Sequence, residues 1–539
     1  MTTAEMDSSA MKEQTNTHEE HVYKNKPQSL DAVSHNIHYP KAWMNWRFVM
    51  YLTIVGLSLG LFGYDNTFTG PLLALPIFIV KYQGNGPAFT ATNLNLLVPV
   101  PLVGAALGTF CATPFTKRFG RKKTFLAAYS LLCTPGSFLQ LFAPNLTALI
   151  IGRFWNTVGV SVLTTVAPLY LSELAPAHVR GRAIGFCIAG SSAAAIVATT
   201  VVWASSKDQS EWQYKTPLAI QAALPVVLGL LTLLVPESPI WAMQRDQSEF
   251  AREVFMTLRN NKVDIVAAEM SQYQVSLMAE AQRREKSRFW DILNRTNLKR
   301  TLSAGACLSA SQVGGQILVL TYSTVILVQS GVGNPFEVTM VISCLIFLGT
   351  LVGPVLVDWV GRRPVALFGF SILFILNLAA GSLAAAGLAT ESQRLGLATV
   401  FILFGFFNSV SFQSVSVLLA AEIPTTALRE ATMSWTIFWS YVTAIVTTFA
   451  VPQITSPDAG NLGAKTAFIF AGCVLVTTIW AYFYIPEAKG RTPAEIDEMY
   501  AIELPMRKWR GHQCVAVNRT AEMVNRDVRV SDAGNKHSA

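Results

Sequence analysis

The feature that most constrains this chain is a series of long apolar segments, because a helix of about 20 such residues spans the hydrocarbon core of a bilayer. Barrel strands would be about half as long and would alternate in polarity, which these segments do not. The sequence therefore predicts an all-α membrane protein with twelve transmembrane helices. They are expected at 48–66, 95–115, 124–143, 147–171, 183–203, 217–235, 303–328, 337–357, 364–386, 396–420, 432–453 and 465–485.

Composition agrees with this interpretation. Only 14% of the residues are charged, whereas a soluble protein carries about 25%. The net charge of +8 does not indicate nucleic-acid binding, because the basic residues lie in the gaps between apolar segments. Six of the seven cysteines lie within apolar segments, and no CxxC or CxxH spacing occurs. We therefore expect the lipid bilayer as a partner, and no nucleic acid, disulfide framework, metal site or cofactor.

Basic residues indicate the orientation, because cytoplasmic loops are enriched in Lys and Arg. The loops that follow even-numbered helices contain Lys117, Arg118, Arg121, Lys122, Lys123, Arg180, Arg182, Arg362, Arg363 and Arg429. The opposite loops contain Lys81, Lys207, Lys215, Arg394 and Lys465. Both termini are therefore predicted to be cytoplasmic, with the protein in the plasma membrane and no cleaved signal peptide.

The polar stretches divide the chain into five parts. A cytoplasmic N-terminal tail (1–47) precedes a six-helix bundle (48–235), and a cytoplasmic C-terminal tail (486–539) follows a second bundle (303–485). The linker between the bundles (236–302) is rich in helix-forming residues over 250–288. We expect it to form short cytoplasmic helices, although a charged, solvated segment would have a similar composition.

Three pairs of motifs recur in the same order along the chain, which indicates a duplicated unit. RFGRKK (118–123) corresponds to WVGRRP (359–364), YLSELAPAHVRGR (170–182) to LLAAEIPTTALRE (418–430), and PESP (236–239) to PEAKGR (486–491). Equivalent residues are 241 to 250 positions apart, from Gly120 to Gly361 and from Pro236 to Pro486. The repeat predicts two six-helix bundles in parallel orientation.

The charged residues of these motifs are predicted to form ion pairs between the two halves, which close the cytoplasmic side and must break to open it. They could alternatively serve only the positive-inside rule, but acidic residues contribute little to that rule. The predicted gate comprises Arg118, Arg121, Glu173, Arg180, Glu237, Asp358, Arg362, Arg363, Glu422, Arg429 and Glu487.

Motifs along the chain resemble those of the sugar porter family of the major facilitator superfamily. They are FGYD (62–65), GR (152–153), PESP (236–239), DWVGRR (358–363) and PEAKGRTPAEIDE (486–498). The resemblance extends over about 48–500 and implies the major facilitator fold and a transporter, not an enzyme. The stretch WQYKTPLAIQ (212–221) is similar to fungal members, among which are hexose and α-glucoside permeases.

The sequence departs from the family pattern in the expected central cavity. Where hexose carriers have polar or aromatic residues in helices 5, 7, 10 and 11, this chain has Ile188, Ile317, Val417 and Ser440. The gate also departs, with Lys117 in place of an Asp and Ile240 in place of an Arg. A glucose-type binding site should therefore not be assumed.

Two ionisable residues within the predicted helices, Asp65 and Arg153, are functional candidates because charges are costly in a bilayer. The helix count places both in the outer half of the N-terminal bundle, where pairing is expected. The resemblance implies that this Asp is the proton-coupling group and the Arg its partner. A fixed structural ion pair is the alternative. All seven histidines lie outside the predicted spans, so no histidine relay is expected.

Amide side chains in helices 7 and 10 are candidates for substrate binding, because amides both donate to and accept from hydroxyl groups. The predicted substrate-binding residues are Gln312, Gln316, Tyr322, Asn408 and Gln413. Polar residues also join helices to one another in membranes, which is the alternative.

The predicted function is proton-coupled import of a sugar or related polyol by a monomer. A permease for another small metabolite, such as a cyclic polyol acid or a secondary product and with export as an option, remains an alternative. A non-transporting sugar sensor is disfavoured by the short polar tail after residue 485.

Overall fold

The computed structural model describes residues 45–84, 86, 88–286, 289–425, 428–512 and 514. The chain divides into two compact units: Met1–Val49 with Pro239–Glu285, and Met50–Ser238 with Lys286–Ala539. Every regular element among the described residues is a helix, which confirms the predicted all-α class.

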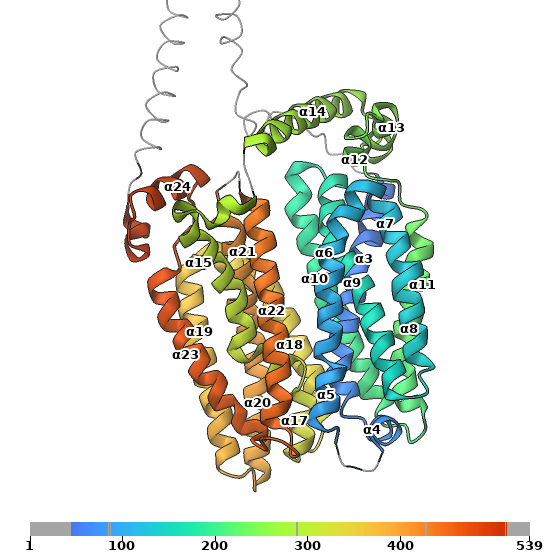
Figure 1. Ribbon diagram of the computed structural model, residues 1–539, viewed down its shortest axis with the longest axis vertical. Helices are drawn as coiled ribbons and strands as arrows, with labels where there is room; N and C mark the ends of the chain where they lie inside the picture. The colour runs from blue at the N-terminus through green and yellow to red at the C-terminus, as the bar shows by residue number, and fades with distance from the viewer. Residues whose placement is uncertain are drawn as a thin grey trace, which may run out of the picture. The chain divides into compact units, whose positions relative to one another are not determined.

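From Met50 onward, both halves of the repeat belong to the larger unit; Figure 1 colours them blue to green and yellow-green to red. The first half consists of α3 (Trp46–Leu72), α4 (Pro76–Gln83), α5 (Ala91–Leu97), α6 (Pro99–Phe119), α7 (Arg121–Ala127), η1 (Ala128–Cys133), α8 (Thr134–Leu141), α9 (Leu146–Leu174), α10 (Ala177–Ser205) and α11 (Trp212–Thr232).

The second half is followed by two short helices of the tail, α24 (Pro493–Ala501) and η6 (Met506–Gly511). It consists of η2 (Phe289–Leu293), α15 (Arg295–Ser311), η3 (Gln312–Gln316), α16 (Ile317–Leu320), α17 (Ser323–Gln329), α18 (Pro335–Val360), α19 (Arg362–Ala385), α20 (Glu391–Asn408), η4 (Ser409–Gln413), α21 (Ser414–Glu422), α22 (Arg429–Thr455), η5 (Gly463–Thr466) and α23 (Ala467–Tyr484).

Within the described residues, 11 helices are long and apolar enough to cross a membrane. The remaining predicted span, 124–143, coincides with α7, η1 and α8, which follow one another without a break. This helix is divided because η1 is a π-helical turn. The structure is therefore consistent with the predicted twelve membrane helices.

Two further π-helical segments, η3 and η4, interrupt the helices predicted at 303–328 and 396–420. In η3, Gly315 has φ +96°, a conformation that favours glycine. Asn377 of α19 donates a hydrogen bond of 3.3 Å to the carbonyl of Gly314 and so satisfies a polar group in this irregular backbone. Such segments are frequent at functional sites, because they redirect the side chains along a helix.

The smaller unit contains α12 (Pro239–Met243) and α13 (Ser248–Leu258), and most of α14 (Val263–Lys286) belongs to it. Its core is formed by Ala242, Met243, Ala251, Phe255 and Val266. A buried ion pair joins Arg259 and Glu269 at 3.0 Å. α15 begins at Arg295, earlier than the predicted start at 303.

The two halves contact each other at the end of the larger unit where α3 ends and α9 begins. The backbone N–H of Ala91, the first residue of α5, donates to both carboxylate oxygens of Asp458 at 2.9 and 3.2 Å. Gly70, near the end of α3, also approaches the second half. A Cβ atom at this position would lie 2.2 Å from the backbone carbonyl oxygen of Thr321. These contacts hold the halves together at that end.

Candidate functional site

A cavity of about 570 Å³ lies within the larger unit and is lined by both halves. The first half contributes Asp65, Arg153 and residues of α6 and α10, and the second contributes residues from α15 to α22. Of the predicted coupling and substrate residues, the cavity brings together Asp65, Arg153, Gln312, Gln316, Asn408 and Gln413. Its location fits the expectation that a transporter binds its substrate between its repeats.

Asp65 is a buried carboxylate, 6% exposed, with two amide donors. Asn156 of α9 donates to Oδ1 at 2.7 Å, and Gln221 of α11 donates to the same oxygen. Since both amides bind Oδ1, Oδ2 has no hydrogen-bond donor among the described residues. One carboxylate oxygen is thus held by the protein while the other can accept a proton.

Arg153 is also buried, but it does not bind the carboxylate of Asp65 directly. Its Nη2 donates to the hydroxyl of Thr69 at 2.8 Å, and that hydroxyl donates to the backbone carbonyl of Asp65 at 3.1 Å. The guanidinium also lies 5.9 Å from the ring centre of Phe68. Among the described residues, no hydrogen bond or ion pair joins the two side chains, so the directly paired arrangement predicted from the sequence is not present. Thr69 instead links the guanidinium of Arg153 to the backbone carbonyl of Asp65.

Three residues of this arrangement, Thr69, Asn156 and Gln221, were missed by the sequence analysis. Each is a polar residue within an apolar segment, and Asn156 follows Arg153 by three positions, which places both on one face of α9. Gln221 ends the stretch WQYKTPLAIQ. The signal was therefore present, but amides in membrane helices are too common to be assigned to one carboxylate without the fold.

The four predicted amides lie at the two π-helical segments of the second half. Gln312 and Gln316 are the first and last residues of η3, whereas Asn408 precedes η4 and Gln413 ends it. All four line the cavity. Asn408 is 3% exposed, and its Oδ1 has no hydrogen-bond donor among the described residues. An unsatisfied buried acceptor costs free energy, so a ligand hydroxyl that donates to it would be favoured.

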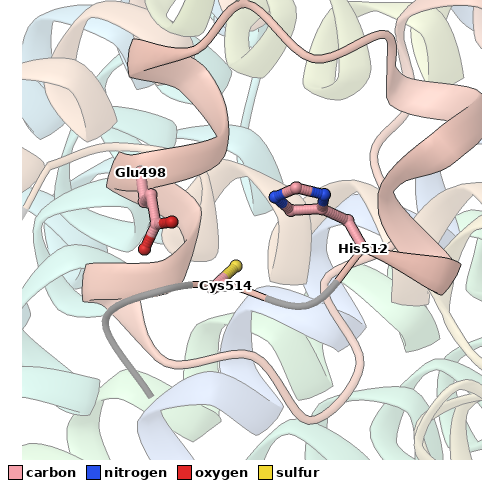
Figure 2. A group of neighbouring side chains, drawn as sticks. All are labelled: Glu498, His512 and Cys514. Atoms are coloured by element: carbon pink, nitrogen blue, oxygen red, sulfur yellow. The ribbon is translucent and has the colours of Figure 1, made fainter. Parts of the chain in front are cut away.

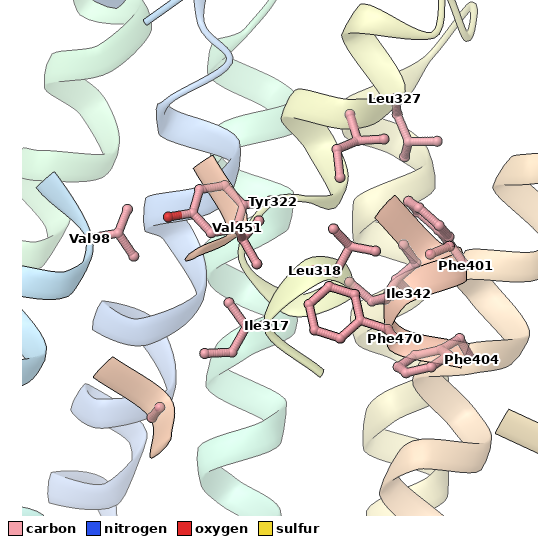
Figure 3. Packing of buried hydrophobic residues seen from close by; sticks show 14 of the residues in the cluster. Val98, Ile317, Leu318, Tyr322, Leu327, Ile342, Phe401, Phe404, Val451 and Phe470 are labelled. Carbon is pink, nitrogen blue, oxygen red and sulfur yellow. The ribbon is translucent and has the colours of Figure 1, made fainter. Parts of the chain in front are cut away.

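Tyr322 lies elsewhere. It is fully buried in a large hydrophobic cluster (Figure 3), and its hydroxyl is 3.5 Å from the carbonyl of Thr448. It is not among the residues that line the cavity. The helix breaks at Thr321 and Tyr322, between α16 and α17, which turns this side chain into the core. Its position gives no support to the predicted role in substrate binding.

Three of the four departures from the family pattern are in the cavity wall. Ile317, Val417 and Ser440 line the cavity, whereas Ile188 is half-exposed and does not. The cavity thus combines a row of amides with apolar positions.

The repeated motifs form a compact charged cluster in the first half. Arg121 binds Glu173 at 2.6 Å, and both side chains are only 6% exposed. Glu237 accepts from the backbone N–H groups of Arg121 at 2.7 Å and Lys122 at 3.1 Å, which caps the start of α7. Gly120 precedes that turn with φ +93°, and a Cβ atom there would lie 2.3 Å from Glu237. Glycine is therefore required where the carboxylate meets the helix.

The second half repeats this cluster. Arg362 binds both carboxylate oxygens of Glu422, at 2.8 and 3.2 Å, and its backbone N–H donates to Glu487 at 3.0 Å. Gly361 has φ +116° and the same close approach to Glu487. Asp358, one turn before Arg362, adds a contact of 3.2 Å. Matching geometry at matching motifs is what a duplicated unit would produce.

These pairs differ from the predicted gate in one respect. The Arg121 and Arg362 ion pairs each lie within one half, whereas the sequence analysis expected pairing between the halves. Each Arg begins a helix and binds a Glu near the end of another helix of the same half. The remaining four predicted gate residues lie near helix ends. Arg118 is near the end of α6, Arg180 in the first turn of α10, Arg363 at the second position of α19 and Arg429 at the start of α22.

Comparison with known proteins agrees with this architecture. The chain is 26% identical over 453 residues to the MFS transporter fmqE of Aspergillus fumigatus, covering 81% of this chain and 83% of that protein. It is 25% identical over 488 residues to the general alpha-glucoside permease of Saccharomyces cerevisiae, covering 87% and 77%.

Among solved structures, the inward open conformation of the xylose transporter XylE from E. coli matches with a TM-score of 0.69. The identity is 18%, over 84% of this chain and 99% of that one, so this similarity concerns the fold. The fold is that of the major facilitator proteins, as the resemblance implied. The profile of the family described as "Sugar (and other) transporter" matches residues 49–500. The chain therefore belongs to the sugar transporter family, and it is a multi-pass membrane transporter and not an enzyme.

Proposed function

We propose that this chain imports a sugar or related polyol together with a proton by alternating access. The observation that carries the proposal is the cavity itself, in which a buried carboxylate with one free oxygen and a row of amides face the same space. Amides suit a ligand with many hydroxyl groups. A carboxylate that a water-filled cavity can reach suits a proton carrier. The relatedness to the general alpha-glucoside permease supports the substrate class.

In this proposal, Asp65 accepts a proton on Oδ2 from the outside. Asn156 and Gln221 can keep their hydrogen bonds to Oδ1 in both protonation states, so the side chain stays in place while its charge is lost. Loss of that charge removes its attraction to Arg153, which remains bound to Thr69. The weakened interaction between α3 and α9 would then let the loaded outward-facing state close. An inside-negative potential supplies about 2.3 kcal/mol per 100 mV for each charge carried.

The proposal places both termini in the cytoplasm and the protein in the plasma membrane as a monomer. The contacts at Asp458 and Gly70 would then close the outer side, and the two charged clusters would lie at the cytoplasmic surface. This assignment is supported by the basic loops of the sequence. It makes the described conformation an inward-facing one.

A second candidate, a permease for another small metabolite, is favoured by one observation. Ile317 and Val417 replace polar or aromatic residues in the cavity wall, and apolar positions suit a ligand with fewer hydroxyl groups. Cyclic polyol acids and secondary products fit that description, and their transport could run outward.

We expect cells that lack their own sugar carriers to gain uptake of at least one sugar or polyol when they express this chain. Growth on a panel of sugars, polyols and cyclic polyol acids, followed by uptake of the labelled substrate, identifies the ligand. Uptake should increase as the external medium is acidified and should fall when an uncoupler is added. Uptake that ignores both treatments would exclude proton coupling, and transport of an acid alone would favour the second candidate.

Replacing Gln312 with Leu should raise KM for the transported substrate about 2- to 12-fold, which is the loss of one ordinary hydrogen bond. Tyr322→Phe is the matched control, because it removes a hydroxyl from a residue outside the cavity. It should leave KM unchanged. Equal KM values for the Gln312 variant and the native protein would remove Gln312 from the binding site.

A further inference from the structure

A group of three metal-binding side chains lies in the tail that follows the second half. Glu498 is on α24, His512 directly follows η6, and Cys514 is two residues further on. One donor atom from each lies within 4.8 Å of the others. Figure 2 shows the carboxylate, the imidazole and the thiol facing a common space. From this arrangement we propose that Glu498, His512 and Cys514 bind a zinc ion.

The set of donors selects the metal. Thiolate, imidazole and carboxylate are the ligands of Zn²⁺, whereas Ca²⁺ and Mg²⁺ require oxygen ligands alone. Ligand atoms around a tetrahedral zinc ion lie about 3.3–3.8 Å apart, given bonds of about 2.0–2.3 Å. The three donors would therefore close by at most about 1–1.5 Å. Glu498 and His512 are only partly buried, so rotation of their side chains can supply that movement. Water would take the fourth position.

The backbone around the site is held in place by contacts that need no metal. Arg491 donates to the carbonyls of Trp509 at 2.8 Å and His512 at 2.7 Å, and to the carboxylate of Glu495 at 3.1 Å. Trp509 is fully buried, and its indole N–H donates to the carbonyl of Leu504. These contacts attach the segment that carries His512 and Cys514 to α24, so little order would have to be gained when a metal binds.

Cys514 is positioned to be a ligand and not only a packing residue. It is 2% exposed and belongs to a small buried cluster with Ala488, Ile496, Met499 and Trp509. His512 and Glu498 are only partly buried, so an ion could reach the buried thiol from their side.

The proposed site lies next to the contacts between the tail and the transport bundle. Asp497, next to Glu498, forms an ion pair with Arg300 of α15, and Arg300 also lies 4.3 Å from the ring centre of Tyr500. α15 leads directly into η3, whose ends are Gln312 and Gln316. A zinc ion would therefore bind beside contacts that already hold the tail on the helix leading to the cavity amides.

The test uses the full chain in detergent with an affinity tag that contains no histidine. Zn²⁺ binding is measured by competition with a chromophoric chelator, and Co²⁺ serves as a spectroscopic probe because only a thiolate ligand gives an intense sulfur-to-cobalt absorption band. The native protein and the control Cys111→Ser, which changes an exposed cysteine on α6, should both bind one ion with this band. Cys514→Ser should lose the band.

Cys514→Ser and His512→Ala should each weaken zinc binding by at least about 10- to 100-fold, because changes to groups that only contact a ligand already cost that much. His512→Ala changes a partly buried residue, so it keeps the test valid if the variant of the buried cysteine does not fold. Histidines of the N-terminal tail cannot produce the thiolate band. A native protein without the band, or variants with unchanged affinity, would overturn the proposal.

Discussion

Replacing Asp65 with Asn should abolish uncoupler-sensitive accumulation of substrate and leave only equilibration across the membrane. Asn has the shape of a protonated Asp, and its amide oxygen can still accept from Asn156 and Gln221. The change therefore removes the exchangeable proton without removing the hydrogen bonds. One proton per substrate at 100 mV supports a concentration ratio of about 50, because 2.3 kcal/mol corresponds to that factor. The ratio should fall to about 1, measured as labelled substrate inside and outside at steady state.

Asp208→Asn is the matched control. It makes the same chemical change at an exposed loop carboxylate, where the amide oxygen can still accept from the N–H of Ser210. Accumulation by this variant should equal that of the native protein. Exchange of labelled for unlabelled substrate should persist in the Asp65 variant, which shows that it still folds and binds. Undiminished, uncoupler-sensitive accumulation by the Asp65 variant would rule out the coupling role.

Replacing Arg121 with Ala should lower the free energy of unfolding by about 3–5 kcal/mol, because it leaves the buried carboxylate of Glu173 without its partner. Ser238 would remain as a hydrogen-bond donor to Glu173, but it carries no charge. Thermal or denaturant unfolding of the purified protein in detergent measures the loss. The variant Arg121→Met with Glu173→Gln should recover most of it, since no buried charge is then left alone.

Two other ion pairs form a graded comparison. Glu422, the partner of Arg362, is 27% exposed, so Arg362→Ala should cost less than Arg121→Ala. Lys299 and Glu503 are 69% and 74% exposed, and Lys299→Ala should leave stability unchanged. If Arg121→Ala is as stable as Lys299→Ala, the charged cluster does not hold the first half together.

Much of the fold follows from the sequence, because bilayer thickness restricts what an apolar segment of 20 residues can form. The helices broken by η1, η3 and η4 could not be placed in the same way. A π-helical turn depends on which neighbouring group satisfies the displaced carbonyl, as Asn377 does for Gly314. That partner is 63 residues away and is known only once the helices pack.

The sequence predicts those parts of the candidate site that stand out as single residues. Asp65 and Arg153 stand out because charge is rare in these helices, and they do line one cavity. Thr69 connects Arg153 to the backbone of Asp65 only because the packed helices bring these groups within hydrogen-bond distance. The spacing of the residues in the sequence does not predict this contact. Tyr322 was misplaced because the break before α17 turns its helix. The proposed zinc ligands have no CxxC or CxxH spacing: His512 and Cys514 are two positions apart, and Glu498 is distant from both in the sequence.

The ion pairs of Arg121 and Arg362 each have both partners in the same half. This arrangement affects the step in which the two halves reorient. When one half rocks against the other, neither buried charge has to be stripped from its partner and rehydrated. Reorientation therefore does not require either of these two ion pairs to break.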